Sequence, residues 1–529
     1  MKRLHALRTV LLLALAGGFI HIPAVQARTR MHTQAQVLAQ TRKQIQMQAP
    51  ELTQPQVQAR AQAMSLDQVI DVARSQSVQA LEARSEFVSD YWAWRSYLAS
   101  RLPSVILYGN LGNFDRSLRL LQNYETGQMI YTENYNMQNS IGLRLRQNIG
   151  FTGGTVSLYT DLTRIDEFSN SGVTWYSQPI TLSYTQPLFA YNQFKWAKLI
   201  SPKEYERARR AYLESMEDVT ISAVESYFSL MSAQMSHEAA KANFRNTSAM
   251  LSIAGTRMSL GSVSRDEYLQ LELRSLNDSL AINDSYDALR QAQMAINSLL
   301  GYDESYEIYP LADDSLPDIS MDYDFVLEKT MQNSSFNYEN QINLLTAESA
   351  IAQAKADRGI TMQLNATFGL SKTSSQFREV YMNLPDQEVV GLSFSVPIFD
   401  WGEGRGKVKK AEAAAEVVKA QVQQAENDKR LALFTAVAQF NGQGRRCEVS
   451  RRARDIAAER YAIVMENFRS GTATVTDLNT ARTESDTALQ QYIEDLGDYW
   501  NYYYTLRKLT LYDFIGGTDI IVDYEEIAQ

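Results

Sequence analysis

Residues 408–425 read VKKAEAAAEVVKAQVQQA, and they lie in a helical pattern that continues without interruption over about 405–468. Small and apolar residues recur in this stretch at alternating spacings of three and four: Val408, Ala411, Ala415, Val418, Val422 and Ala425. Such heptad spacing predicts a helix that packs lengthwise against another helix. About 64 residues at ~1.5 Å each predict a rod of roughly 95 Å, which is longer than a globular domain needs.

A second helix of similar length is predicted at about 195–258. Its apolar seam follows the same alternation of four and three and comprises Tyr212, Met216, Val219, Ala223, Ser226, Leu230 and Ala233. Two long helices with heptad seams predict coiled-coil packing. The predicted fold class is therefore mixed α and β but mainly α.

The two long helices belong to an internal repeat. The segment SYTQPLF at 183–189 resembles SFSVPIF at 393–399, and the distance from Pro187 to Pro397 is 210 residues. Later landmarks keep this offset: Gly261 and Gly471, then Tyr302-Asp303 and Tyr512-Asp513. Three landmarks in one register predict a duplicated unit. Each copy is expected to contain a helix, a β region, the long helix, a glycine turn and a medium helix.

The boundaries of these parts follow from the pattern. The first helix of the unit is predicted at 66–100 and again at 324–357, and the medium helix at 265–300 and again at 475–511. The predicted organisation is a signal peptide at 1–27, a Gln-rich lead-in at 28–63, repeat 1 at 64–303, a linker at 304–323, repeat 2 at 324–513 and a C-terminal tail at 514–529.

The N-terminus resembles a secretory signal peptide. Basic Lys2, Arg3 and Arg8 precede the apolar run VLLLALAGGFI, and the small residues before position 28 predict cleavage after Ala27. The residue directly after that site is Arg28 and not Cys, so no lipid anchor is predicted there. Beyond it we find no run of 18 apolar residues and predict no transmembrane helix.

Composition excludes several classes of protein. The chain has 51 Lys+Arg and 61 Asp+Glu, and this net charge of −10 argues against a general nucleic-acid binder. A single Cys and four His argue against a disulfide framework or a Cys-rich metal site. We find no paired catalytic carboxylates, nucleophile motif or phosphate loop, so no catalytic residue, cofactor or metal site is predicted.

The β segments alternate between apolar and polar residues. In the first copy Ile180, Leu182 and Tyr184 oppose Thr181, Ser183 and Thr185; the second copy alternates in the same way over 362–370 and 390–396. A membrane-spanning barrel strand and a soluble strand with one wet face both have this pattern, so alternation leaves both open. Aromatic residues just past the prolines fit an interfacial belt: Phe189, Tyr191, Phe399 and Trp401.

Signal peptide, doubled strand–helix–helix unit, strand-end prolines and paired glycine turns together resemble the TolC family of outer-membrane efflux channels, over roughly 64–515. The resemblance implies a homotrimer in which each chain gives four strands to a shared 12-stranded barrel in outer-membrane lipid. It also implies a long periplasmic helical tunnel that meets an adaptor protein, and through the adaptor an inner-membrane transporter. The alternative is a periplasmic or surface coiled-coil scaffold or adhesin with a soluble β-domain.

One stretch departs from the family pattern. Pro103 and Pro187 lie 84 residues apart, whereas only 37 separate Ile360 and Pro397. The extra residues include two strand-like segments, 141–150 and 154–162, and Arg144 and Arg146 are expected on the polar face of the first. This insertion is either an added barrel hairpin or an extracellular hairpin, and repeat symmetry favours the extracellular hairpin.

The resemblance also assigns roles to the glycine turns. By this likeness Gly261, Ser262, Gly471 and Thr472 form the periplasmic tip that contacts the adaptor. The same glycines also fit ordinary helix C-caps in the left-handed conformation.

The family places acidic residues of the tunnel entrance six residues after each glycine. Here these are Glu267 and Asp477, which threefold symmetry would arrange as carboxylate rings. Ser264 and Thr474 precede them by three residues, so both acids also fit capping boxes. The family's second acid is replaced by Thr480, which predicts a less negative entrance unless Asp266 compensates.

Three other motifs are predicted to be structural. GEGRG at 402–406 lacks the third glycine of a dinucleotide-binding loop and fits a strand-to-helix crossover. His237 continues a helix seam and is expected to be a core residue. The aromatic run at 499–504 is expected to pack against neighbouring helices.

Overall fold

The computed structural model describes residues 61–122, 127–169, 171–311 and 316–528. The chain divides into two units, Met1–Arg60 and Ala61–Gln529, and the first lies wholly outside the described residues. The predicted signal peptide and most of the Gln-rich lead-in therefore lie there as well. The last residues of the lead-in form a short strand, β1 (Ala61–Met64), parallel to β6 (Glu307–Pro310) in the predicted linker.

Helices of the two halves correspond in order and in length. The corresponding elements are α3 (Leu66–Gln76, 11 residues) and α7 (Tyr323–Asn333, 11), α4 (Val78–Ser100, 23) and α8 (Ser335–Arg358, 24), α5 (Gln193–Ser259, 67) and α9 (Glu403–Ser470, 68), and α6 (Arg265–Leu300, 36) and α10 (Val475–Thr510, 36). The two longest helices lie where the heptad seams predict them. The order of elements supports the repeat, although duplication itself stays a prediction.

The first helix of each half is interrupted, which the sequence patterns did not predict. Ser77 has extended backbone between α3 and α4, and Ser334 has the same conformation between α7 and α8. The Ser77 hydroxyl accepts the Ala80 N–H at 3.0 Å, so it begins a new helix instead of continuing the old one. The Ser334 hydroxyl instead donates to the Thr330 carbonyl of α7 at 2.6 Å. A serine with extended backbone therefore divides each predicted segment into two helices, and at Ser77 its side chain also caps the second one.

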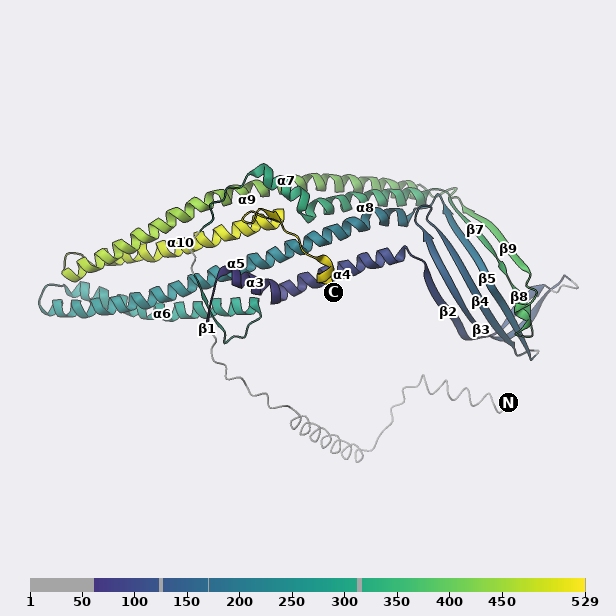
Figure 1. Ribbon diagram of the computed structural model, residues 1–529, viewed down its shortest axis with the longest axis horizontal. Helices are drawn as coiled ribbons and strands as arrows, with labels where there is room; N and C mark the ends of the chain where they lie inside the picture. Colours follow the sequence, from purple (N-terminus) through teal and green to yellow (C-terminus); the bar gives the residue numbers. More distant parts are fainter. Residues whose placement is uncertain (1–60, 123–126, 170, 312–315, 529) are drawn as a thin grey trace, which may run out of the picture. The chain divides into compact units, whose positions relative to one another are not determined.

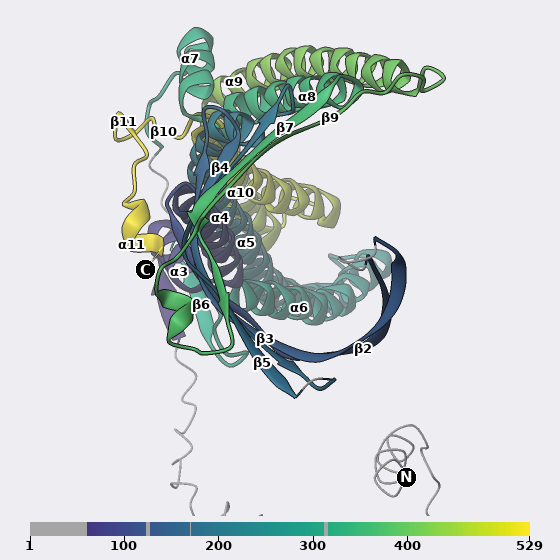
Figure 2. The same ribbon diagram turned by 90° about the vertical axis from the view of Figure 1, so that its right-hand side faces the viewer.

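The helices lie side by side, and their neighbours can be followed along the molecule (Figures 1 and 2). Near the sheet the order is α4, α5, α8 and α9, and beyond it the order is α6, α5, α10 and α9. Helices α6 and α9 are therefore the outer helices of the second row. The main core joins α3, α5, α9 and α10, where Tyr227, Phe440 and Tyr503 are almost completely buried.

One antiparallel sheet joins the helices at one end (Figure 1). Its long strands pair in the order β2 (Ser104–Gln122), β3 (Met129–Ile149), β4 (Gly154–Glu167), β5 (Gly172–Leu188), β7 (Thr361–Leu370) and β9 (Asp386–Ser395). A short strand, β8 (Lys372–Ser374), also pairs with β5, and a 3₁₀ turn covers Glu379–Tyr381. Strands β2 and β9 are the two edges of this sheet.

The sheet therefore contains six long strands where the resemblance implies four, and the strands of the insertion lie within it. Whether these strands form an extracellular hairpin or cross the membrane stays a prediction. Residues 141–162 belong to β3 and β4, which pair with each other and with β2 and β5 inside the sheet. Their connecting turn lies at the helical end, where Asn192 Nδ2 donates to the Gly150 carbonyl at 3.1 Å and Gln147 Nε2 to the Arg101 carbonyl at 2.9 Å. Repeat symmetry did not reveal these strands, because their partners in β2 and β5 are distant in the sequence.

The C-terminal tail forms two short strands and a helix that contacts α4 and α5. Strand β10 (Tyr512–Asp513) pairs with β11 (Thr518–Asp519), and α11 (Tyr524–Ala528) follows. The Tyr524 ring lies 5.5 Å from the Phe87 ring of α4, and the Arg209 guanidinium lies 4.2 Å from the Tyr524 centroid. The predicted tail therefore packs on the helices.

Several structural predictions are confirmed. His237 is 5% exposed, its Nδ1 lies 3.0 Å from the Ser285 hydroxyl, and burial lowers its pKa. Tyr499 and Tyr503 are buried, and their hydroxyls donate to the Pro317 carbonyl and to Asp513 at 2.8 and 2.7 Å. Gly402 precedes α9 in the left-handed conformation, and residues 403–406 form the first turn of that helix, as expected for a crossover.

The four aromatic residues past the prolines do not share one environment. Phe189, Phe399 and Trp401 are 75%, 71% and 89% exposed, which fits an interfacial belt. Tyr191 instead lies against α8, where its hydroxyl is 2.6 Å from that of Ser349. None of the helices among the described residues is both long and apolar enough to cross a membrane.

Candidate functional site

The two glycine turns have the backbone that the sequence predicts. Gly261 follows α5 with φ +75°, and Gly471 ends α9 with φ +93°. The Gly261 N–H donates to the Met258 carbonyl at 3.0 Å, and the Gly471 N–H to the Asn467 carbonyl at 2.9 Å. Both glycines are exposed. Each turn therefore combines a left-handed helix terminus with an accessible surface.

Arg257 of α5 joins the two turns. Its Nη1 donates to the Phe468 carbonyl at 3.2 Å, and its Nη2 to the Arg469 carbonyl at 2.6 Å. These carbonyls belong to the last turn of α9, whose partial negative charge favours a cation. A buried cluster lies next to this junction: Met250, Ala254, Leu271, Phe468, Val475 and Leu478. The structure thus brings both predicted turns to one end of the helices (Figure 1).

Glu267 and Asp477 make the capping boxes that their spacing predicts. The Ser264 N–H donates to Glu267 Oε2 at 2.9 Å, and the Thr474 N–H donates to Asp477 Oδ2 at 3.0 Å. The Thr474 hydroxyl donates to the same oxygen at 2.6 Å, and these two bonds from Thr474 lower the pKa of Asp477. Their local role is established, and lining of an entrance stays a prediction. Asp266 is exposed and accepts a bond from Gln270 at 2.8 Å.

A buried polar layer holds the α5–α6 hairpin against the α9–α10 hairpin, and the sequence analysis missed it. Arg482 Nη1 of α10 lies 2.9 Å from Asp278 Oδ2 of α6, and these side chains are only 8% and 4% exposed. The Thr247 hydroxyl of α5 donates to the same oxygen at 2.6 Å. Asn243 of α5 donates to Asp486 of α10 at 3.0 Å. We call these five residues the polar layer.

A signal for this layer is present in the sequence. Asp278 follows Leu271 by seven residues, and Arg482 follows Leu478 by four, so both charges fall on apolar seams. A charge on a seam needs a buried partner. The offset of 210 pairs Arg482 with Glu272, which is exposed, so the repeat pattern does not reveal the layer.

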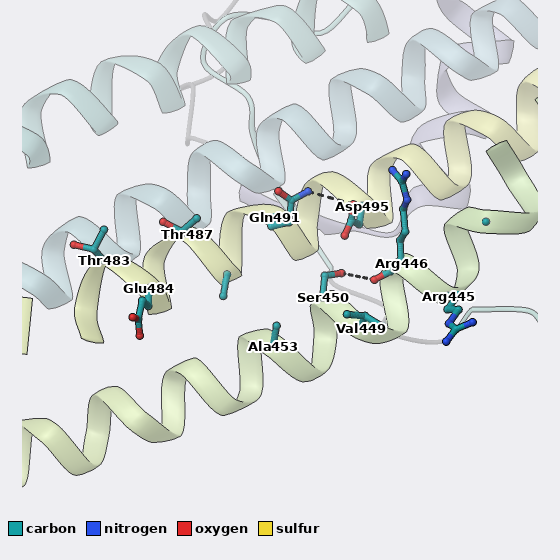
Figure 3. A pocket seen from close by; sticks show the side chains of 12 residues that line it. Arg445, Arg446, Val449, Ser450, Ala453, Thr483, Glu484, Thr487, Gln491 and Asp495 are labelled. Carbon is teal, nitrogen blue, oxygen red and sulfur yellow. Dashed lines mark hydrogen bonds between the residues drawn. The ribbon is translucent and has the colours of Figure 1, made fainter. Parts of the chain in front are cut away.

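A groove of about 810 Å³ lies between α9 and α10 (Figure 3). It is lined by Gly442, Arg445, Arg446, Val449, Ser450, Ala453, Thr483, Glu484, Thr487, Ala488, Gln491 and Asp495. Figure 3 shows Ala453 and Val449 on one helix opposite Thr483 and Thr487 on the other. The lining therefore combines small side chains with longer charged and amide ones.

An apolar ridge lies on α6, at the other end of the helix row. It consists of Leu269, Leu273, Leu276 and Leu280, which are 49%, 60%, 63% and 62% exposed. The 210-residue offset places Leu273 at the same distance from its glycine turn as Thr483, which lines the groove. The ridge and the groove therefore lie at matching positions along the helices. Four adjacent exposed leucines indicate an interaction surface.

Comparisons with known proteins agree with this architecture. Residues 338–510 match the model of the outer membrane efflux protein family. The Campylobacter jejuni CmeC outer membrane channel superposes with a TM-score of 0.61 at 15% identity, over 87% of this chain and 88% of that one. The channel OprN gives 0.59 at 15% identity, over 84% and 89%, and VceC of Vibrio cholerae gives 0.58 at 13%, over 86% and 96%. No curated protein matches the sequence.

These matches confirm the resemblance that the sequence showed. The structural matches establish the fold, and the family match identifies residues 338–510 as similar to the outer membrane efflux protein family. The chain therefore has the fold of TolC-type outer-membrane channels, and residues 338–510 carry the similarity to the outer membrane efflux protein family. Among the residues that the structure describes, no group of His, Cys, Asp and Glu is arranged to hold a metal ion.

Proposed function

We propose that three copies of this chain form an exit duct, with a shared transmembrane β-barrel and a periplasmic helical tunnel. The observation that carries this proposal is the open sheet, whose strands β2 and β9 each have a partner on one side only. Unpaired backbone groups in hydrocarbon cost several kcal/mol each, by a rough estimate, so a sheet in a membrane must close. Other copies of the chain supply the missing strands and close it.

The helices support the same assembly. The leucine ridge of α6 and the groove of α9 and α10 lie at opposite ends of the helix row and at matching positions along it. In a ring of copies, the ridge of one protomer fills the groove of the next. This contact would remove the exposed leucines from water, at about 25 cal/mol per Å² of apolar surface.

Transport through the duct is passive, and an inner-membrane pump supplies the energy through an adaptor. The adaptor contacts the exposed turns around Gly261, Ser262, Gly471 and Thr472. The predicted signal peptide at 1–27 would direct export, and the helices of the two halves match in order and length, which supports this arrangement.

The polar layer controls opening of the periplasmic end. The turns can separate from one another only if the α9–α10 hairpin moves away from α5–α6, which exposes or separates Asp278 and Arg482. Glu267 and Asp477 then line the entrance as rings that favour cations. A closed duct is expected to conduct poorly and to be blocked by divalent cations.

Assembly is tested by replacing one leucine of the ridge. Leu276→Arg should abolish the trimer band of unheated protein in mild detergent, because the ridge no longer fits an apolar groove. Asn277→Arg is the matched control, since Asn277 is an exposed neighbour on the same helix. A wild-type protein that stays soluble and monomeric after carbonate washing would overturn the duct and favour a scaffold.

Adaptor contact is tested separately by cross-linking. Ser262→Cys and Thr472→Cys, each carrying a short thiol-reactive photo-cross-linker, should link the chain to the adaptor in intact cells. Asn283→Cys, exposed along α6, should not. Equal cross-linking from all three positions would remove the turn assignment.

A further inference from the structure

The apolar face of the sheet continues without a break through β3 and β4. One row across the sheet consists of Val105, Leu145, Leu158, Leu182 and Phe368, contributed in turn by β2, β3, β4, β5 and β7. The side chains of these five residues are between 39% and 70% exposed. The inserted strands thus carry the same apolar surface as the strands that the repeat predicts.

The opposite face of the inserted strands is polar and matches its neighbours equally well. Arg146 pairs with Ser157, Ser157 with Ser183, and Ser183 with Thr367. One row further on, the Arg144 guanidinium lies 4.7 Å from the Tyr108 centroid and 5.6 Å from that of Tyr159. A polar face opposite an apolar one is typical of barrel strands, whose polar side faces the water-filled lumen.

The inserted strands also extend to the helical end of the sheet. Ile149 pairs with Gly154 across the turn, and β2 begins at Ser104 opposite Arg146. The anchoring of this turn by Asn192 and Gln147 holds it beside the first residues of α5 and the end of α4. A hairpin that lay wholly on the extracellular side would have its turn far from the helices, not beside them.

We propose that β3 and β4 cross the outer membrane as barrel strands, so that three copies form an 18-stranded barrel instead of the 12-stranded barrel of the family pattern. This inference rests on the proposed trimer. Barrel diameter grows roughly linearly with strand number, so the opening would be about 1.5 times as wide. Barrels of this size leave an aqueous channel.

Closure requires β2 of one copy to pair with β9 of the next. Strand β2 leaves the helical end after α4, whereas β9 returns to that end before α9, so the two edges meet antiparallel. The even number of long strands makes this direction possible. The partner at both edges is thus a second copy of this chain.

Thiol labelling tests which face of the inserted strands meets lipid. A membrane-impermeant, water-soluble maleimide should label Arg144→Cys and Ser157→Cys, which face the lumen, in assembled trimers. It should label Leu143→Cys and Leu158→Cys at least tenfold more slowly. Cys447 does not interfere, because its side chain is buried.

Matched positions on β5 separate the two proposals. Leu182→Cys should be protected and Ser183→Cys should be labelled in any barrel. Rapid labelling of Leu143→Cys and Leu158→Cys with Leu182→Cys protected would overturn the 18-stranded barrel and leave the duct. Rapid labelling of Leu182→Cys as well would overturn the duct itself.

Disulfide cross-linking tests which strands are neighbours. Val105→Cys combined in turn with Val390→Cys, Leu392→Cys or Phe394→Cys should give linked dimers and trimers on oxidation. Val105→Cys with Leu182→Cys should give no link within a chain, because three strand spacings of ~4.8 Å exceed the reach of a disulfide.

Two outcomes of the cross-linking would overturn the inference. A link between Val105→Cys and Leu182→Cys within one chain would mean that β3 and β4 lie outside the barrel. A link between Leu158→Cys and Leu392→Cys of different chains would mean that β2 and β3 lie outside it.

Discussion

The two halves of the chain agree in their helices and differ in their strands. Paired helices differ by at most one residue in length, 67 against 68 for the longest. The first half nevertheless contributes four long strands to the sheet and the second half two. Helices that connect the same turns to the same sheet must match in length, since each residue adds a rise of ~1.5 Å. An antiparallel sheet can accept another hairpin without moving its ends.

The halves also differ at the polar layer, where we expect the largest single-residue effect. Asp278→Ala would remove the closer of the two carboxylates beside buried Arg482 and leave only Asp486 at 3.6 Å, which should lower the free energy of unfolding by ~2–4 kcal/mol. Glu272→Ala, at the position equivalent to Arg482, should change it little, because Glu272 is exposed. Urea unfolding in detergent, followed by helical circular dichroism, measures both variants.

The same substitution tests the gate. Asp278→Ala should raise the basal conductance of channels in planar bilayers, because α10 is released from α6. If the free energy of unfolding of Asp278→Ala stays within ~0.5 kcal/mol of wild type, as for an ordinary surface site, the polar layer does not stabilise the assembled protein.

The second prediction compares an inserted strand with a strand of the second half. Leu158→Arg and Leu364→Arg should each lower barrel stability by ~2–4 kcal/mol if they lie near the middle of the bilayer. Ser157→Arg and Gln363→Arg, on the polar face, should be nearly neutral. Heat resistance of the trimer on gels ranks the four variants. If Leu158→Arg leaves the heat resistance of the trimer unchanged and Leu364→Arg lowers it, the two halves do not share one barrel.

The third prediction compares the turns. Gly471→Val and Gly261→Val both force a branched residue into the left-handed region, at roughly 1–2 kcal/mol. Gly471→Val should cost more, because its Cβ would lie 3.3 Å from Arg257 Nη1, whereas the space beside Gly261 is open. Thermal unfolding gives the order, and efflux should fall in both while trimers still form. An equal loss of stability in Gly471→Val and Gly261→Val would mean that contact with Arg257 does not stabilise the junction of the two turns.

The smallest effect concerns Asp477 and its pH dependence. The Thr474 bonds hold the pKa of Asp477 below its ordinary value of 3.8, so the stability they provide is complete above that pH and is lost as pH falls through the lower folded value. Crowding of three carboxylates would instead raise the pKa. If cation selectivity is constant from pH 7 to 5, the capping bonds determine the pKa of Asp477. If selectivity is already lost in that range, repulsion between the three carboxylates determines it.

Asp477→Asn isolates the charge from the cap. It retains most of the capping geometry but removes one carboxylate per chain. Selectivity and divalent block recorded in planar bilayers should both fall. If Asp477→Asn and Glu267→Gln both leave cation selectivity and divalent block unchanged, the two acids do not line the entrance, and the duct proposal still stands.

The sequence by itself determined the features that depend on neighbours along the chain. Heptad spacing located α5 and α9 to within a few residues, the glycines marked the left-handed turns, and Ser264 and Thr474 marked the capping boxes. Each of these signals acts within about two helical turns, so one segment contains all of its evidence.

Only the tertiary structure decided which distant segments meet. The strands at 141–162 have the same alternation whether they lie inside the sheet or beyond it, and their partners in β2 and β5 settle the matter. Likewise, the burial of Asp278 and Arg482 follows from contact between helices that are 204 residues apart at this point. Long-range pairing has no local pattern, because the free energy of a buried charge or a strand edge depends on the partner that the fold brings to it.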